Sequence, residues 1–208
     1  MSRRAYFNEV AESWDQMYYT SEPAVFLKEL VQRFGLKLGQ IILDAGTGTG
    51  VLVPFLLEAI GSSGSVTAID YAENMIKVFR SKFSNLRNVR AELKDVEDLD
   101  LPAETFDAAV CFGLFPHLEH TEQALMNLNR VLKRDGRLVI AHALGSSEIR
   151  EHHKGVSPVA QDLLPEEEKM KRMLKQTGFS DVHIIDEPGL YLCLAAKAPP
   201  SPRRRKQK

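Results

Sequence analysis

A glycine-rich turn directly after an acidic residue is the feature of this sequence with the clearest chemistry. In ILDAGTGTG, Asp44 ends a short apolar run and is followed by Gly46, Gly48 and Gly50. Glycine lets the backbone approach a ligand closely, and the start of the next helix presents free amide groups. A dinucleotide fingerprint would need glycine in place of Val51, and the Gly-Lys-Ser/Thr of a phosphate-binding loop is absent. Because a carboxylate before the turn repels a pyrophosphate, the motif favours a ligand with ammonium and sulfonium groups.

Two more acidic residues follow the next predicted strands. Asp70 ends VTAID, and Asp95 follows a strand over residues 89–92. At the carboxyl end of a parallel strand, Asp70 can accept both hydroxyls of a ribose, and Asp95 can accept a hydrogen bond from the exocyclic amine of adenine. Taken alone, Asp70 would be interpreted as a solvated helix cap, but the neighbouring glycine turn favours the ribose. The three strand ends together outline an amino-acid-bearing nucleoside without phosphates.

Strands and helices alternate along the chain, which predicts a parallel sheet covered on both faces by helices. The last two strands are joined by a turn that is short enough only for an antiparallel hairpin. The expected strands are residues 41–43, 66–70, 89–92, 106–112, 137–141, 182–185 and 191–196, and the expected helices are 21–35, 51–60, 73–83, 121–132 and 165–177.

This pattern predicts a single α/β domain over residues 36–197. We expect residues 1–35 to form a helical cap over the active site. Residues 145–164 are polar with weak periodicity, which predicts a substrate lid loop. Residues 198–208 are expected to be a disordered basic tail, because like charges without apolar neighbours cannot pack.

Composition excludes several classes of protein. With 208 residues, 44% hydrophobic and 26% charged, the chain suits one globular domain. No apolar run reaches the ~18 residues of a membrane span, and the start MSRRAYFNEV is charged where a secretory signal is apolar. Cys111 and Cys193 lie among apolar residues and are predicted to be core thiols in a reducing cytoplasm. Without its basic tail the chain is acidic, so nucleic acid is not an expected partner.

Four stretches resemble the class I S-adenosylmethionine-dependent methyltransferases. They are LDAGTGTG, VTAIDYAENMI, LKDVEDLDLPAETFDAAV and LNRVLKRDGRLVIA. The resemblance covers about residues 36–145 and is to the small-molecule members of methyltransferase type 11, which include the ubiquinone/menaquinone C-methyltransferases. It implies a doubly wound, Rossmann-like sheet of seven strands in the order 3-2-1-4-5-7-6 with the last strand antiparallel. It also implies S-adenosyl-L-methionine as cofactor and S-adenosyl-L-homocysteine as product.

By this resemblance the cofactor residues lie at the strand ends and in the turns that follow. The turn after Asp44 would hold the methionine part, and Asp70 would hold the ribose. Met75 would pack near the adenine, whose edge would contact Asp95 and Val96. The full set is Asp44, Gly46, Gly48, Gly50, Asp70, Tyr71, Met75, Asp95, Val96 and Phe112.

The N-terminal YFNEVAESWDQMYY resembles the opening of the quinone-type members. Its aromatic rings, Tyr6, Trp14, Tyr18 and Tyr19, could close over a sulfonium, because aromatic faces attract cations. A helix that packs these rings on the core is an equally good interpretation, and the two are compatible.

Histidines cluster in the segments expected to surround the pocket: His117, His120, His142, His152 and His153. No recognised metal-ligand spacing occurs, so no metal is expected. Since imidazole titrates near neutral pH, His117 and His142 are the candidates for acid/base catalysis, while surface or core histidines remain the alternative. Tyr6, Trp14, Tyr19, Arg150 and His153 are the candidate substrate or lid residues, and Arg150 with Lys154 could bind an anionic acceptor.

The sequence thus predicts a methyltransferase for a small-molecule acceptor that is quinone-like or phenolic. A thiol, an amine or an anionic metabolite is the alternative acceptor, and a non-catalytic S-adenosylmethionine-binding protein is the alternative from another class. An RNA methyltransferase is disfavoured, because residues 113–116 read GLFP where a base-methylating tetrapeptide would stand. The acceptor atom and the oligomeric state stay open.

Overall fold

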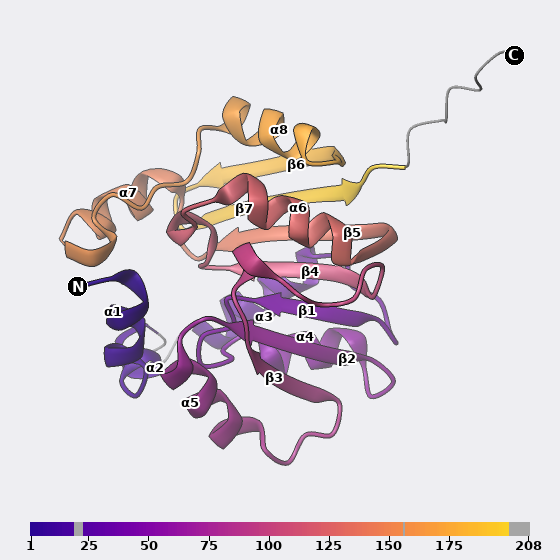
Figure 1. Cartoon of the computed structure of the whole chain (residues 1–208), viewed down its shortest axis with the longest axis horizontal. Helices are drawn as coiled ribbons and strands as arrows, with labels where there is room; N and C mark the ends of the chain where they lie inside the picture. The colour runs from indigo at the N-terminus through magenta and orange to yellow at the C-terminus, as the bar shows by residue number, and fades with distance from the viewer. Residues whose placement is uncertain (19–22, 156, 200–208) are drawn as a thin grey trace, which may run out of the picture.

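The computed structural model describes residues 1–18, 23–155 and 157–199, and its centre is a seven-stranded sheet (Figure 1). The strand order is β3-β2-β1-β4-β5-β7-β6, as predicted. β7 is antiparallel to both of its neighbours, and the other paired strands are parallel. The strands are β1 Ile41–Ala45, β2 Ser65–Asp70, β3 Val89–Leu93, β4 Phe106–Phe112, β5 Leu132–His142, β6 Phe179–Glu187 and β7 Leu190–Lys197.

Helices cover both faces of this sheet. The α-helices are α1 Arg3–Val10, α2 Trp14–Tyr18, α3 Pro23–Arg33, α4 Val53–Ile60, α5 Glu73–Phe83, α6 Thr121–Val131, α7 Ser146–Lys154 and α8 Glu167–Gln176. The described residues also form short 3-10 turns: η1 Val96–Asp98, η2 Phe115–His117 and η3 Ser157–Val159. Of the described helices, none has both the length and the apolar character that a bilayer crossing requires.

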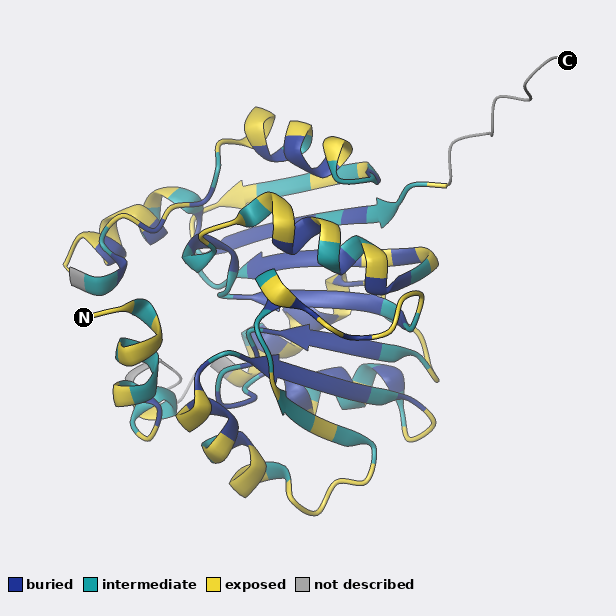
Figure 2. Cartoon of the chain, in the orientation of Figure 1, coloured by how far each residue is buried: buried dark blue, intermediate teal, exposed yellow. Residues whose placement is uncertain are grey.

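The apolar runs of the central strands explain the two layers. Side chains alternate along a strand, so Ile42 faces the layer of α3 and α4, while Leu43 faces the layer of α6 and α8. Both residues are fully buried, as the dark blue central strands of Figure 2 show. Cys111 and Cys193 are free, buried thiols in the second layer, which confirms the prediction that they are core residues.

Residues 145–164 differ from the predicted loop, because they contain helix α7 and the turn η3. The Glu148 carboxylate accepts hydrogen bonds from the amides of Gly145 and Gly189, at 2.8 and 2.6 Å, and so fixes the start of α7. In α7 only Ile149 and His153, four residues apart, are buried. A stripe of two residues was too short to produce a helical pattern in the sequence.

The N-terminal segment divides into two parts. α1 and α2 lie at the carboxyl ends of the parallel strands, facing α7 (Figure 1). α3 instead packs in the core layer with α4, through Leu27, Leu30 and Val31. The structure therefore places α3 in the sheet's helical layer and not in the predicted cap. Residues 200–208, which make up most of the predicted tail, and Tyr19 lie outside the described residues.

Candidate active site

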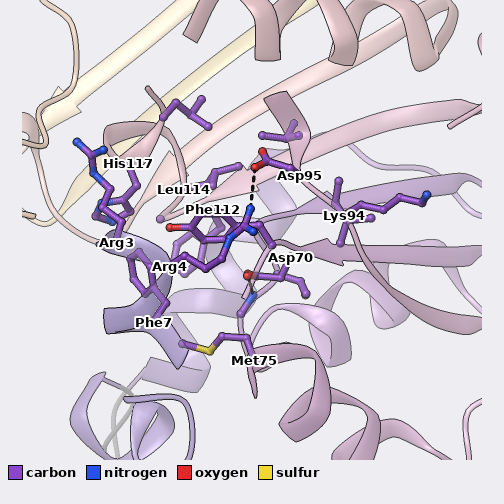
Figure 3. Close-up of a pocket in the computed structure, with 18 of the residues that line it drawn as sticks. Arg3, Arg4, Phe7, Asp70, Met75, Lys94, Asp95, Phe112, Leu114 and His117 are labelled. Carbon is purple, nitrogen blue, oxygen red and sulfur yellow. Dashed lines mark hydrogen bonds and ion pairs between the residues drawn. The ribbon is translucent and has the colours of Figure 1, made fainter. Parts of the chain in front are cut away.

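A cavity of about 400 Å³ lies at the carboxyl ends of the parallel strands, within the size range of small-molecule sites. Its walls come from α1 and α2, from the turn after β1, from the ends of β2 and β4, and from the segments that follow β3 and β4 (Figure 3). The site thus lies where parallel α/β sheets bind their ligands, because the loops after the strands diverge there.

Asp44, the penultimate residue of β1, lines this cavity, although its side chain is nearly inaccessible to water. Its carboxylate accepts a hydrogen bond from Thr47 Oγ1 at 2.6 Å. Burial raises the pKa of Asp44 to about 6; the Thr47 bond opposes this shift and the nearby Asp70 adds to it. An ionised Asp44 is therefore costly, and a cationic ligand would relieve that cost.

Asp70 ends β2 and holds the glycine turn from the neighbouring strand. Its carboxylate accepts hydrogen bonds from the amides of Gly48 and Ala72, at 2.9 and 2.8 Å. Burial raises the pKa of Asp70 to about 6, although these backbone bonds favour the ionised form. Gly48 lines the cavity at φ +54, and a Cβ on it would have no neighbour closer than 3.8 Å, so that position is open toward the ligand space.

Gly50, also a predicted cofactor residue, packs against α5. It is not among the residues that line the cavity, and a Cβ on it would lie 2.4 Å from Phe83 and 2.7 Å from Phe79. Glycine is required at this position for the close packing of the turn on α5. Gly46 does line the cavity, and a Cβ there would overlap Leu114.

The remaining predicted cofactor residues, Tyr71, Met75, Asp95, Val96 and Phe112, all line the cavity. Burial raises the pKa of Tyr71, so its hydroxyl stays neutral. The guanidinium of Arg4 lies over the Tyr71 ring, 5.0 Å from its centroid, and 3.4 Å from Asp95 Oδ2 (Figure 3). A cation thus covers the ring of Tyr71, a predicted cofactor residue, and the carboxylate of Asp95, which was expected to contact the adenine edge.

The structure separates the two candidate catalytic histidines. His117, in η2, lines the cavity and packs against the Phe7 ring at 5.1 Å. Its Nδ1 lies 2.7 Å from Asp162 Oδ2. Burial lowers the pKa of His117, and the Asp162 carboxylate opposes that shift. The pocket geometry therefore supports His117 as an acid/base group that is neutral near pH 7.

His142 is not among the residues that line the cavity. Burial lowers its pKa to about 3, so the ring is neutral and cannot act as a base that becomes charged near pH 7. Among the described residues its Nδ1 has no hydrogen-bond partner. Its ring lies 6.5 Å from that of Phe112, which does line the cavity.

Of the candidate substrate and lid residues, some line the cavity and others do not. Trp14 lines the cavity, whereas Tyr6 packs on Phe7 and is not part of the lining. His153 is buried behind His117, with its Nδ1 2.7 Å from the Asp162 carbonyl oxygen. Arg150 is exposed and does not line the cavity, as is also true of His120, His152 and Lys154. Tyr19 and the side chain of Tyr18 lie outside the described part of the chain.

Sequence reasoning missed the charged groups that close the cavity. Arg3 and Arg4 of α1 line it, and Arg3 contacts Asp162 from the segment before α8. Arg3 and Asp162 are 159 positions apart, and neither lies in a motif. No sequence signal connects such residues. Within the described ranges, no three His, Cys, Asp or Glu side chains are arranged to hold a metal ion.

Comparisons with known proteins agree with this geometry. A family model described as "Methyltransferase domain" matches residues 42–136. A demethylmenaquinone methyltransferase of Staphylococcus aureus strain MRSA252 is 31% identical over 137 residues, which are 64% of this chain and only 56% of that relative. The protein of the same name from strain JH9 is 26% identical over 205 residues, which are 86% of this chain and 85% of that relative.

Solved structures share the fold. A methyltransferase from Aquifex aeolicus, named as dependent on S-adenosylmethionine, has a TM-score of 0.72 at 24% identity, over 95% of this chain and 100% of its own. An N-methyltransferase of Haemonchus contortus, solved with phosphomonomethylethanolamine and S-adenosylhomocysteine, has a TM-score of 0.76 at 18% identity, over 95% of this chain and 58% of its own. Residues 42–136 thus match a methyltransferase domain in sequence, and nearly the whole chain has the fold of structures named as S-adenosylmethionine-dependent methyltransferases.

Proposed function

We propose that this enzyme methylates a small hydroxylated aromatic acceptor, quinol-like or phenolic, and that His117 accepts the proton that the acceptor loses. The observation that carries the proposal is the lining of the cavity on the side away from Lys94 in Figure 3. There Phe7, Phe112 and Leu114 lie with the His117 imidazole, beside the side chains of Arg3 and Arg4 that close the cavity. Apolar and aromatic walls can pack against a flat aromatic ring, and the imidazole can form a hydrogen bond with a hydroxyl on that ring. The names of the Staphylococcus aureus relatives support a quinol.

The opposite side of the cavity fits the cofactor. When bound, S-adenosylmethionine supplies an electrophilic methyl group on a positively charged sulfur. Asp44 and the glycine turn would hold its cationic amino-acid part, and Asp70 would hold the ribose. Tyr71 and Asp95 would hold the adenine. The fit rests on two buried carboxylates whose pKa values are raised to about 6, since such groups favour a positively charged ligand.

His117 has the protonation state that a base needs. Because a carboxylate only accepts hydrogen bonds, the Nδ1 next to Asp162 carries the proton and Nε2 keeps its lone pair. Its lowered pKa keeps the ring neutral at pH 7. A phenol or quinol loses a proton during methylation, at oxygen or at the ring carbon, and Nε2 can accept it. Phe7 packs against the imidazole and shields it from water.

The test is transfer of a radioactive methyl group to a panel of acceptors: 1,4-naphthoquinol, catechol, 2-mercaptoethanol and phosphoethanolamine. We expect label in the naphthoquinol or catechol. His117→Gln should lower kcat about 10²- to 10⁴-fold while S-adenosylhomocysteine still binds. His120→Gln is the matched control, because His120 is exposed and outside the cavity. Label only in the thiol or the amine, or unchanged transfer by His117→Gln, would overturn the proposal.

A further inference from the structure

Asp162 is a buried carboxylate whose partners come from distant parts of the chain. Its side chain is 1% exposed, and it lies between η3 and α8. His117 Nδ1 of η2 lies 2.7 Å from Oδ2. Arg3 Nε of α1 donates to both carboxylate oxygens at 2.9 Å, and Arg3 Nη2 donates to Oδ1 at 2.5 Å. One carboxylate thus connects the N-terminal helix, the segment before α8 and the histidine of the cavity.

The arrangement is that of an imidazole base, His117, and a carboxylate that orients it, Asp162. A carboxylate accepting from Nδ1 fixes the ring orientation and the tautomer, and it stabilises the imidazolium that forms when Nε2 takes up a proton. Burying such a carboxylate is costly unless it is paired, and the two-pronged contact from Arg3 provides that pairing. Hydrogen bonds from His117 and Arg3 outweigh the effect of burial and lower the pKa of Asp162, so it is ionised at neutral pH.

From these contacts we propose that Asp162 is the positioning residue for His117, and that Arg3 holds Asp162 in place for this task. The proposal rests on the proposed function, in which His117 is the base. By this proposal, His117 has its orienting carboxylate in place only when α1 and the segment before α8 are both packed against η2. His117 would therefore be correctly oriented only in a closed cavity, from which water is excluded.

Four charged or titratable groups face His117 from the packed elements: Arg3 from α1, Asp162, His153 from α7 and His142 from β5. Asp162 raises the pKa of His117, while Arg3 and His153 lower it. The negative charge of Asp162 thus stabilises the protonated His117 ring. Replacing Asp162 by the equally sized, uncharged Asn should lower the pKa of His117 and remove the preference for the Nδ1–H tautomer.

The experiment is a pH titration of the full chain with ¹⁵N-labelled histidine, followed by two-bond ¹H–¹⁵N spectra of the imidazole rings. His117→Gln assigns the signals. In the wild type we expect His117 as the Nδ1–H tautomer, and in Asp162→Asn a mixture of tautomers and a lower titration midpoint. Glu119→Gln is the matched control, because the Glu119 carboxylate also pairs with Arg3, at 2.7 Å, but forms no hydrogen bond with His117 in the described part of the chain. It should leave the His117 spectrum unchanged.

The wild-type spectrum is a test by itself, because an Nε2–H tautomer of His117 would overturn the proposal. The proposal therefore remains testable even if Asp162→Asn folds poorly. An unchanged His117 spectrum in a folded Asp162→Asn would overturn it too. With a working acceptor, Asp162→Asn should shift the acidic limb of the kcat profile to lower pH and lower kcat at least about tenfold. If the spectra change as expected but no phenol or quinol is methylated, the proposed function fails while the role of Asp162 stands.

Discussion

Binding of S-adenosylmethionine should release protons near pH 6. Asp44 and Asp70 are buried at the ends of β1 and β2, and both have a pKa raised to about 6. At pH 6 each carboxyl is therefore about half protonated, and a cationic ligand that holds both ionised would release about one proton in total. At pH 7 each is about nine-tenths ionised, so the release falls to about 0.2 proton. The affinity should rise with pH over this range, because protons compete with the ligand.

The assay is calorimetric titration at pH 6 in phosphate and in Bis-Tris, whose ionisation enthalpies differ. The dependence of the observed heat on the buffer gives the number of protons released. Asp44→Asn should remove about half of the release, because Asp70 remains. Adenosine, which has no ammonium or sulfonium group, should release fewer protons than S-adenosylmethionine.

His117 provides the control for other titrating groups. Burial lowers the pKa of His117, and His117→Gln should leave the proton release from the two carboxyls in place. Equal heats in the two buffers at pH 6 would refute the argument, since they would mean that the two carboxyls are already ionised in the protein alone.

Three other outcomes can be checked on the purified chain. Arg4→Ala removes a guanidinium from over Tyr71 and should tighten S-adenosylmethionine binding about 2- to 5-fold by calorimetry, as expected for an exposed cation–π contact; weaker binding would contradict this. Gly50→Ala would place a methyl group 2.4 Å from Phe83 and should cost about 1–3 kcal/mol in urea unfolding, with unchanged stability as the contrary result. Asp44→Asn should raise the free energy of unfolding at pH 8 by up to about 3 kcal/mol, because the raised pKa disfavours the ionised carboxyl above about pH 6. This gain should shrink as the pH falls toward 4, and a gain independent of pH would exclude ionisation as its cause.

The sheet and the acidic side of the cavity could be predicted because their signals are local. A buried parallel strand is an unbroken apolar run, and Asp44 and Asp70 each end such a run. Once the strand order was expected from the family resemblance, the carboxyl ends of β1 and β2 had to be neighbours, which the pairing of Ala45 with Ile69 shows. The positions of the two carboxylates followed from this arrangement.

The acceptor side could not be predicted in the same way. His117 follows a buried strand and His142 ends one, and their sequence context does not show which ring enters the cavity. That choice depends on η2, which turns the chain after β4 toward α1. The contact of Arg3 with Asp162 depends on how α1 packs against a segment more than 150 positions away. Such contacts arise from tertiary packing of polar residues, which leave no periodic pattern in the sequence.

The electrostatics of the cavity connect its two sides. Burial raises the pKa values of Asp44 and Asp70 and lowers that of His117, so the cavity disfavours charge at all three groups. Binding of a cationic methyl donor would favour the ionised forms of Asp44 and Asp70 on one side of the cavity. Its positive charge would also help to keep His117 neutral on the other side. In the proposed reaction the donor would lose a positive charge, and His117 would gain one by accepting the acceptor's proton. The net charge of the cavity is then the same before and after the reaction, so a buried site can carry it out without a large reorganisation of solvent. Asp162 contributes to this balance, because its carboxylate stabilises the imidazolium where the new charge arises.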